Sequence, residues 1–378
     1  MEDSFHCAAA LVMDFGGSGA KGIGLRTESG IGKPFLICLN PEVEPVTKAS
    51  IDAYMSGILG ASEPENRCWI AIGKQYYAIG ALARERFHAE VDLHPLKWED
   101  AIRKTLAAVW VLSERLGLGN EFDISIATLL PPGEYKNDRI RFESKLKETL
   151  ANFLTPSGNF KVNLVFFDCK PEGAGIYLYR RRVLKDAIMQ SVMAVAMIGH
   201  RNASLLFSNK GSIGEGVSSN HGCNQLVEIF VNETSGTGVH PTDKIIRAIV
   251  EAGAEVKGQP FLALARSCSA ANKKEDVKQM VKATRLAREQ YFQMLTRWLD
   301  KKLPPERNEL IFCGGTAHLF KQELSERYSS DTVLWDADVE LPPTLDTVGL
   351  GNRLADVYAM YRTFRERLSS RLGVKSTD

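Results

Sequence analysis

The sequence has no long apolar run. No uninterrupted apolar stretch approaches the roughly 18 residues that a membrane-spanning helix requires. The first residues, Met1 to His6, also lack the basic start of a signal peptide. We therefore expect neither a signal peptide nor a transmembrane segment.

Paired cysteines and clustered histidines are also missing. The seven cysteines are scattered along the chain without any C-x-x-C motif, which argues against a disulfide framework and against a zinc site. The seven histidines lack the spacing of metal ligands. This pattern fits a reducing compartment, so we expect the protein to be cytoplasmic.

Neither sign of charge is in excess. The 47 Lys and Arg residues balance the 46 Asp and Glu residues, for a net charge of +1. Such a chain has no overall field to attract nucleic acid or an anionic membrane, so we expect no direct nucleic-acid binding. The 378 residues, 44% of them hydrophobic, instead predict a globular protein. At about 150 residues per domain, about two to three domains are expected.

Glycine is concentrated in a turn near the N-terminus. The apolar run Ala8 to Met13 ends in Asp14-Phe15-Gly16-Gly17-Ser18-Gly19-Ala20-Lys21, and Gly22 to Thr27 follows as a second strand. Glycines let backbone amides approach an anion closely, and Lys21 adds a positive charge where phosphate oxygens would lie. Asp14 is suited to hold a hydrated Mg²⁺ rather than the phosphate itself.

Three known glycine signatures fail to describe this turn. Gly17 to Gly22 fits G-x-G-x-x-G, but a dinucleotide site needs a helix there, and the β-prone residues 23–27 follow instead. A Walker A loop needs Ser or Thr after its Lys, whereas Gly22 follows Lys21. The later motifs of a protein kinase are absent. A strand pair that binds phosphate by its hairpin turn remains, beside the alternative of an ordinary Asp/Gly hairpin.

The first half of the chain continues with alternating strand and helix patterns. Apolar runs predict strands, and amphipathic spacing predicts helices. The segment 40–67, rich in Pro, Glu, Ser and Gly, is expected to be a small insertion or an exposed loop. The predicted strands cover residues 33–39, 68–73, 75–80, 122–130 and 159–167, and the predicted helices cover residues 96–116 and 137–153.

A further helix is expected to start at Pro171. Pro at the first helical position and Glu172 in the first turn suit a helix start. Gly173 and Gly175 lower helix propensity and allow close backbone approach, which favours a functional role for this segment over a purely structural one.

The opening pattern begins again near the middle of the chain. The pattern predicts an apolar strand at residues 191–199, a polar turn at residues 200–204, a returning strand at residues 205–208 and a third strand at residues 210–217. This repetition indicates an internal duplication of one sheet domain. Further helices are predicted at residues 225–232, 241–252, 273–303, 317–327 and 353–372, with a buried strand at residues 310–313.

With these pieces in order, the sequence resembles the actin, heat-shock and sugar-kinase ATPase superfamily. Its first phosphate motif is similar to residues 14–21, its connecting motif to residues 171–179, its second phosphate motif to residues 198–204, and its adenosine motif to residues 310–317. Within the superfamily the sequence resembles the actin-like proteins of the ParM/StbA plasmid-segregation type. The residues that carry this likeness are 69–83, 171–175 and 348–352.

The resemblance implies an α/β protein with an actin-like fold, in which two duplicated ribonuclease-H-like domains surround a nucleotide cleft. The expected domain I covers residues 1–187, with the small insertion near 40–67. Domain II covers residues 188–347. Residues 348–378 are expected to form a C-terminal helix that returns to domain I.

The resemblance also implies the site residues. ATP or ADP, with GTP as an alternative, would bind together with Mg²⁺, which Asp14 positions through water. Asp14 and Glu172 are the expected catalytic residues, with Glu172 orienting the attacking water. The other expected nucleotide contacts are Gly16, Gly17, Ser18, Gly19 and Lys21 in the first turn, Gly199, His200 and Asn202 in the second turn, and Gly314, Gly315 and Thr316 at the adenosine.

The implied activity is ATP hydrolysis linked to filament assembly, either in plasmid DNA segregation or as a prokaryotic cytoskeletal filament. The implied partners are further copies of the chain and a DNA-binding or membrane-associated adaptor protein. Two alternatives stay open: a sugar-type kinase of the same superfamily, and a nucleotide-dependent scaffold that hydrolyses weakly. A kinase commonly uses Asp as its base, whereas this chain has Glu172.

Two positions depart from the resembled pattern. An acidic residue is usual two positions before the glycine of the second phosphate motif, and Met197 stands there. Met cannot hold a water of the Mg²⁺ shell, which motivates the weakly hydrolysing alternative. Near the C-terminus, Asn352 matches the usual asparagine, but residues 353–356 replace the small residues expected after it.

Overall fold

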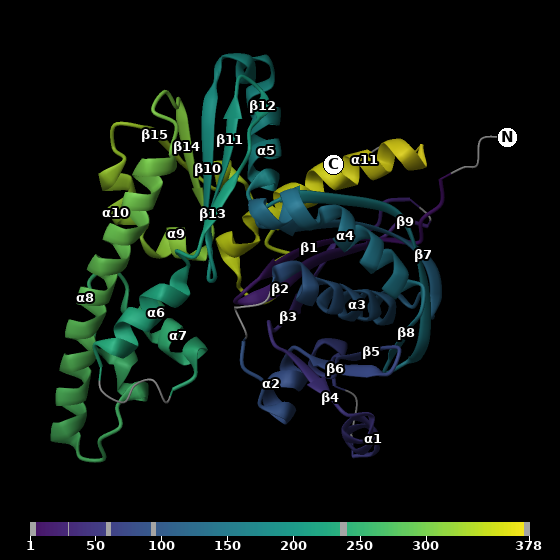
Figure 1. The fold of residues 1–378 in the computed structure, drawn as a ribbon, viewed down its shortest axis with the longest axis horizontal. Helices are drawn as coiled ribbons and strands as arrows, with labels where there is room; N and C mark the ends of the chain where they lie inside the picture. The colour runs from purple at the N-terminus through teal and green to yellow at the C-terminus, as the bar shows by residue number, and fades with distance from the viewer. Residues whose placement is uncertain (1–4, 29, 58–61, 92–95, 235–239, 374–378) are drawn as a thin grey trace. The chain divides into compact units, whose positions relative to one another are not determined.

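The chain folds into two compact units. A computed structural model describes residues 5–28, 30–57, 62–91, 96–234 and 240–373 (Figure 1). Unit 1 consists of residues 1–183 and 339–378, and unit 2 of residues 184–338. None of the helices in the described ranges has the length and apolar content that crossing a bilayer requires.

Unit 1 is built on a large sheet. Its strands are β1 (Ala9–Gly16), β2 (Gly19–Arg26), β3 (Phe35–Leu39), β4 (Val43–Val46), β5 (Trp69–Ile72), β6 (Gln75–Ile79), β7 (Glu121–Leu130), β8 (Phe153–Thr155) and β9 (Gly158–Pro171). Its helices are α1 (Lys48–Ser56), α2 (Ala81–Phe87), α3 (Lys97–Leu116), α4 (Pro132–Leu150), α5 (Ala174–Leu184) and α11 (Ala355–Leu372). In the described residues the strands follow the order β3-β2-β1-β7-β9-β8-β5-β6-β4.

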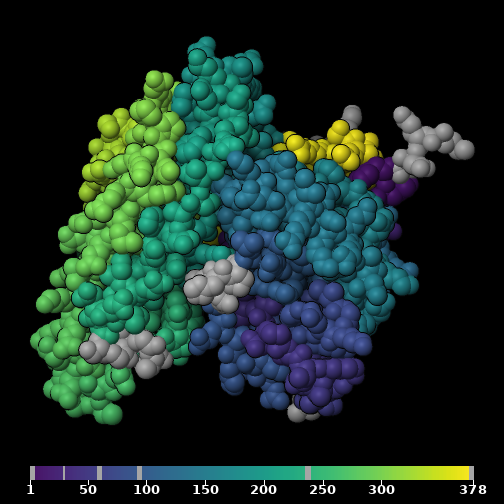
Figure 2. Space-filling view, viewed as in Figure 1, coloured from purple at the N-terminus to yellow at the C-terminus, as the bar shows by residue number. Residues whose placement is uncertain are grey.

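The two faces of this sheet are covered by different helices. Successive residues of a strand point to opposite faces, and β1 illustrates this alternation. Leu11 and Met13 pack with α3 and α4, whereas Ala10 and Val12 pack with α11. The outer side of α11 reaches the surface of unit 1, where its yellow atoms are visible in Figure 2. Strand β1 is therefore buried on both faces, as its continuous apolar run predicts.

Unit 2 has a smaller sheet. Its strands are β10 (Val192–Ile198), β11 (Ala203–Asn209), β12 (Ser212–Ile213), β13 (Val217–Ser219), β14 (Glu309–Cys313) and β15 (Thr332–Trp335). Its helices are α6 (Cys223–Asn232), α7 (Thr242–Ala252), α8 (Ala270–Lys302), α9 (Gly315–Leu319) and α10 (Lys321–Arg327). The helices of unit 2 pack with Ala194, Ala196 and Ile198 of β10 in one apolar core.

The two sheets repeat one topology. In unit 1, β1 is antiparallel to β2 and parallel to β7, and β2 is antiparallel to β3. In unit 2, β10 is antiparallel to β11 and parallel to β14, and β11 is antiparallel to β12. The parallel pairs β7–β9 and β14–β15 complete the match. The predicted duplication of one sheet domain is therefore confirmed.

The segment 40–67 is more ordered than expected. It contains β4 and α1, and β4 pairs with β6 at the end of the sheet. Of the two expected forms, only the exposed loop is wrong for these elements, because strand pairing overrides a composition rich in Pro and Glu. Residues 58–61 of this segment lie outside the described residues.

The start of α5 also differs from the prediction. Pro171 is the last residue of β9, and α5 begins at Ala174. The helix is capped by α11, since the Asp356 carboxylate accepts hydrogen bonds from the amides of Gly173, at 2.7 Å, and Ile176, at 3.1 Å. A Cβ on Gly175 would lie 2.1 Å from the carbonyl oxygen of Asp356. Close packing of α11 therefore explains this glycine without any ligand.

The carboxyl group of Asp356 is fully enclosed at this junction. Burial raises its pKa to about 7, and the negative charges of Asp14 and Glu172 act in the same direction. The two amide hydrogen bonds oppose this shift. The carboxyl group therefore holds a proton in the folded protein at pH values where it would lose it in the unfolded chain.

Gly175→Ala is expected to destabilise unit 1. The new Cβ meets backbone rather than a side chain that can move, so the free energy of unfolding should fall by about 1–3 kcal/mol or more. Gly133→Ala is the matched control, because a Cβ at Gly133 of α4 meets nothing within 4 Å. Urea unfolding should show no loss for the control and up to about 1 kcal/mol of gain. Equal stability of the two variants would contradict the close contact of α5 and α11.

Asp356 should make the stability of the protein depend on pH. Its pKa in the folded state lies above the ordinary value of 3.8, so its contribution is complete below about pH 4 and is lost as the pH rises to about 7. Urea unfolding of the wild type and of Asp356→Asn, measured every half unit across this range, isolates the effect. As the pH rises, the unfolding free energy of the wild type should fall relative to that of Asp356→Asn. Parallel curves would mean that the carboxyl group ionises normally.

Candidate functional site

The first predicted turn joins β1 to β2 through Gly17 and Ser18. Asp14 and Lys21 lie opposite each other across this hairpin, and both side chains are buried. The Lys21 ammonium donates a hydrogen bond to Oδ2 of Asp14 and another to the carbonyl oxygen of Arg353, at 3.2 Å. Lys21 therefore holds the carboxylate of Asp14 in place.

Glycine is favoured at both ends of this turn. A Cβ on Gly16 would lie 3.0 Å from the carbonyl oxygen of Gly19 and 3.2 Å from Nζ of Lys21. Gly19 has a φ of +144°, which a side chain would strain. Gly16 to Gly19 thus form a tight turn with Lys21 packed beneath it.

Asp14 is a charged group with an unused acceptor. Burial alone would raise its pKa, but the positive charges of Lys21 and Lys97 outweigh burial, and the pKa lies below its ordinary value. Its Oδ1 is buried and has no hydrogen-bond partner among the described residues. An ionised carboxylate with one such oxygen fits a water molecule of a hydrated Mg²⁺.

Glu172 is buried in the turn between β9 and α5. Its backbone amide donates to the carbonyl oxygen of Leu130 at 2.7 Å, which fixes the turn against the end of β7. Its carboxylate forms an ion pair with Lys97, the first residue of α3. The amides of Gly173 and Ile176 at the start of α5 donate to Asp356, and the carboxylate of Glu172 lies against Lys97.

Lys97 is the site residue that the sequence analysis missed. Its Nζ pairs with Glu172 and lies 3.9 Å from Oδ1 of Asp14. Burial would lower the pKa of Lys97, but Glu172 and Asp14 raise it above the ordinary value, so the side chain stays charged. A usable signal was present in the sequence, because a cation in the first turn of a helix opposes the helix dipole and suggests an anionic partner.

Arg353 reaches the first turn from the C-terminal segment. Its guanidinium donates to Oγ of Ser18 at 2.9 Å and to the carbonyl oxygen of Ser18 at 3.2 Å. Arg353 is one of the residues that replace the expected small ones after Asn352. This departure therefore supplies a contact to the turn, and unit 1 gathers Asp14, Lys21, Lys97, Glu172 and Arg353 around one hairpin.

The second predicted turn, in unit 2, joins β10 to β11. The amide of Gly199 donates to the carbonyl oxygen of Asn202 at 3.0 Å and closes the turn. The first amides of α6 donate to the carbonyl oxygens of Gly199, at 3.1 Å, and His200, at 3.0 Å. The N-terminus of α6 is therefore bound to this turn by two hydrogen bonds.

The predicted adenosine segment packs against the same turn. Gly314 has a φ of +93°, and a Cβ there would lie 2.5 Å from the carbonyl oxygen of Ile198. Oγ1 of Thr316 donates to the carbonyl oxygen of Gly199 at 2.8 Å. Gly315 is exposed and Thr316 is buried. Unit 2 thus brings Gly199 and residues 314–316 together, with Gly314 required by backbone contact.

Met197 lies near the carboxyl end of β10. It is opposite Ser204 of β11 and Cys313 of β14, and it is partly exposed. Among the described residues, no cluster of three or more His, Cys, Asp or Glu side chains forms a metal site. The side chain of Met197 is a thioether, so it offers no carboxylate oxygen at this end of β10.

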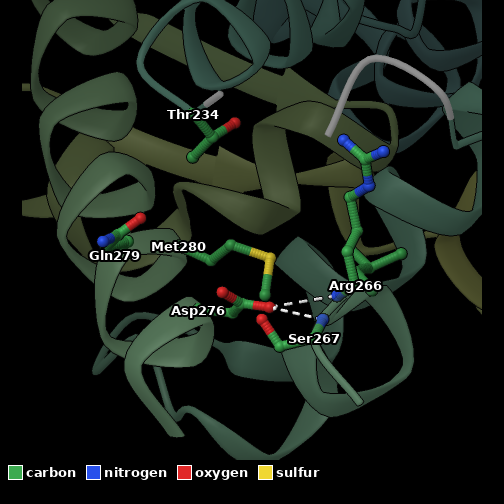
Figure 3. A pocket seen from close by; sticks show the side chains of 7 residues that line it. Thr234, Arg266, Ser267, Asp276, Gln279 and Met280 are labelled. Carbon is green, nitrogen blue, oxygen red and sulfur yellow. Dashed lines mark hydrogen bonds between the residues drawn. The ribbon is translucent and has the colours of Figure 1, made fainter. Parts of the chain in front are cut away.

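A separate pocket of about 210 Å³ lies elsewhere in unit 2 (Figure 3). Asp276 of α8 points to the backbone there and accepts hydrogen bonds from the amides of Ser267, at 2.9 Å, and Arg266, at 3.1 Å. These bonds lower the pKa of Asp276. None of the predicted site residues lines the pocket, whose lining residues are Thr234, Leu264, Arg266, Ser267, Asp276, Gln279 and Met280.

In sequence comparison, no protein-family profile matches this chain, and no curated protein does. Comparison with solved structures gives matches across nearly the whole chain. A ParM from Clostridium botulinum, in a 15-stranded filament, is 14% identical with a TM-score of 0.57, covering 96% of this chain and 100% of that chain.

Two further solved structures match to a similar extent. The archaeal actin homologue Ta0583, in complex with ADP, is 18% identical with a TM-score of 0.54, covering 95% of this chain and 99% of that one. An AlfA filament bound to AMPPNP is 11% identical with a TM-score of 0.52, covering 96% and 98%. The chain therefore has the actin-like fold.

Proposed function

We propose that this protein binds ATP with Mg²⁺, hydrolyses it, and assembles into filaments in a nucleotide-dependent way. The observation that carries the proposal is the group of buried charges at the first turn, in which Lys97 lies between Asp14 and Glu172. Buried ions are costly, and a structural core does not need them. Phosphoryl transfer, in contrast, depends on charged groups held in fixed positions.

The residues of unit 1 suit distinct tasks in this reaction. The amides of Gly16 to Gly19 and Lys21 are expected to bind phosphate oxygens, and Oδ1 of Asp14 would accept a hydrogen bond from a water of the metal shell. When bound, Mg²⁺ would supply neutralisation of the phosphate charge. The carboxylate of Glu172, fixed by Lys97 and by its backbone bond to Leu130, would orient the attacking water.

The residues of unit 2 remain predicted contacts of the nucleotide. Gly199, His200 and Asn202 form a closed turn of the kind that presents backbone amides to an anion. Residues 314–316 lie against that turn and are expected to contact the adenosine. ATP and ADP are the expected nucleotides, with GTP as the alternative to be tested beside them.

Filament assembly is supported by the structural neighbours, since the ParM and AlfA structures named above were solved as filaments. We propose that copies of this chain assemble likewise, in plasmid DNA segregation or as a prokaryotic cytoskeletal filament in the cytoplasm. With a net charge of +1, the chain has no strong attraction of its own for DNA or membrane. A DNA-binding or membrane-associated adaptor protein would supply that link.

A weakly hydrolysing scaffold is the second candidate function. Met197 favours it, because a thioether cannot hold a metal-bound water where the resembled proteins have an acid. A sugar-type kinase is less well supported, since such kinases commonly use Asp as the base, whereas this chain has Glu172.

Purified protein should form sedimentable polymer with ATP and Mg²⁺, and less without nucleotide. Light scattering, pelleting and phosphate release, measured together, separate the candidate functions. Polymer with phosphate release supports the proposed function, and stable polymer without it supports the scaffold. No polymer with ATP or GTP, combined with sugar-dependent ADP release, would replace the proposal with the kinase.

Glu172→Gln should slow hydrolysis by about 10²-fold or more and leave nucleotide binding intact, because a neutral amide orients the attacking water poorly. Polymer of this variant should persist longer after ATP addition. Glu148→Gln is the control, since Glu148 is exposed on α4 and pairs with Lys145. Unchanged phosphate release in Glu172→Gln would remove Glu172 from the mechanism.

A further inference from the structure

Lys97 occupies an unfavourable position for a lysine. It begins α3, where the helix dipole is positive, and only 8% of its surface is exposed. The next amide, that of Trp98, donates to Oε2 of Glu134 at 2.9 Å, so a carboxylate already lies at this helix end. The helix therefore gains nothing from Lys97, and the reason for this cation must lie in what surrounds its ammonium group.

The surroundings of Lys97 are acidic. Its Nζ pairs with the buried carboxylate of Glu172 and lies 3.9 Å from Oδ1 of Asp14, too far for a hydrogen bond. An ammonium group carries three N–H donors, so it can bind a further anion beside Glu172. Lys97 thus bridges the acid expected to position the metal and the acid expected to orient the attacking water.

We propose that Lys97 is a ligand of the terminal phosphoryl group of a nucleoside triphosphate, which its ammonium group would bind while it stays paired with Glu172. The inference rests on the proposed function. The terminal phosphoryl group lies between metal and attacking water in phosphoryl transfer, which is the place between Asp14 and Glu172. Two carboxylates alone would repel it, whereas the ammonium of Lys97 would attract it.

This role makes Lys97 a specificity residue. A diphosphate lacks the group that Lys97 would bind, so Lys97 should strengthen the binding of ATP more than that of ADP. A charge-assisted hydrogen bond of this kind corresponds to about a 10-fold to 100-fold difference in affinity. Lys97 would thereby let the protein distinguish the two nucleotides before any hydrolysis.

The test compares the affinities of AMPPNP and ADP, both with Mg²⁺, for the full-length chain at concentrations too low for assembly. Lys97→Met should weaken AMPPNP binding by about 10-fold or more and change ADP binding less. Lys104→Met is the matched control, since Lys104 lies on the same helix with the same 8% exposure, about 10 Å further along. The control should retain the wild-type ratio of the two affinities.

A second variant excludes an indirect effect through the charge of Glu172. If Lys97 only neutralised Glu172, adding Lys97→Met to Glu172→Gln would leave the affinity ratio unchanged. If Lys97 binds the phosphoryl group, Lys97→Met should lower the ratio of AMPPNP affinity to ADP affinity by a similar factor in the Glu172→Gln background and in the wild-type background. An unchanged ratio in that background overturns the inference.

Failure of the proposed function would look different. In that case the wild-type protein would bind neither AMPPNP nor ADP, and no variant would be needed to see it. A wild-type protein that binds both nucleotides, with a ratio that Lys97→Met does not alter, rejects the role of Lys97 alone.

Discussion

The burial of four charged side chains beside one hairpin is the constraint on which unit 1 depends. Asp14, Lys21, Lys97 and Glu172 are each almost completely removed from solvent. Any one of them alone would carry a large desolvation penalty, and they are tolerable only because two cations meet two anions at contact distance. The four residues come from β1, β2, α3 and the turn after β9, so the charge balance exists only when these distant segments have assembled.

The C-terminal segment completes this arrangement. Asp356 caps α5, Arg353 donates to Ser18, and the carbonyl oxygen of Arg353 accepts a hydrogen bond from Lys21. A stretch of four residues is thereby bonded to the first turn and to the segment that carries Glu172. Residues 353–356 depart from the small residues of the resembled proteins, and the structure shows that two of them use their side chains to bind.

The sequence predicted those features that follow from local pattern. Apolar runs located β1 and β10, helical spacing located α3 and α8, and repetition of the strand pattern indicated the duplication. It failed where a distant segment decides the local structure. Pro171 looked like a helix start, but pairing of β9 with β7 extends the strand through it. Lys97 was overlooked because its anionic partners lie more than 70 residues away in the sequence.

The glycines and the buried ions differ in how strongly they support a bound ligand. Gly175 and Gly314 belong to the motifs that carried the resemblance, yet at each position a Cβ would lie too close to a backbone carbonyl oxygen, at 2.1 and 2.5 Å. Packing accounts for them fully. No packing requirement accounts for Lys97 between two carboxylates, since apolar side chains of similar volume often stabilise a core as well as an ion pair does. The ions at the first turn, rather than the glycines, are therefore the stronger argument that unit 1 binds a charged ligand.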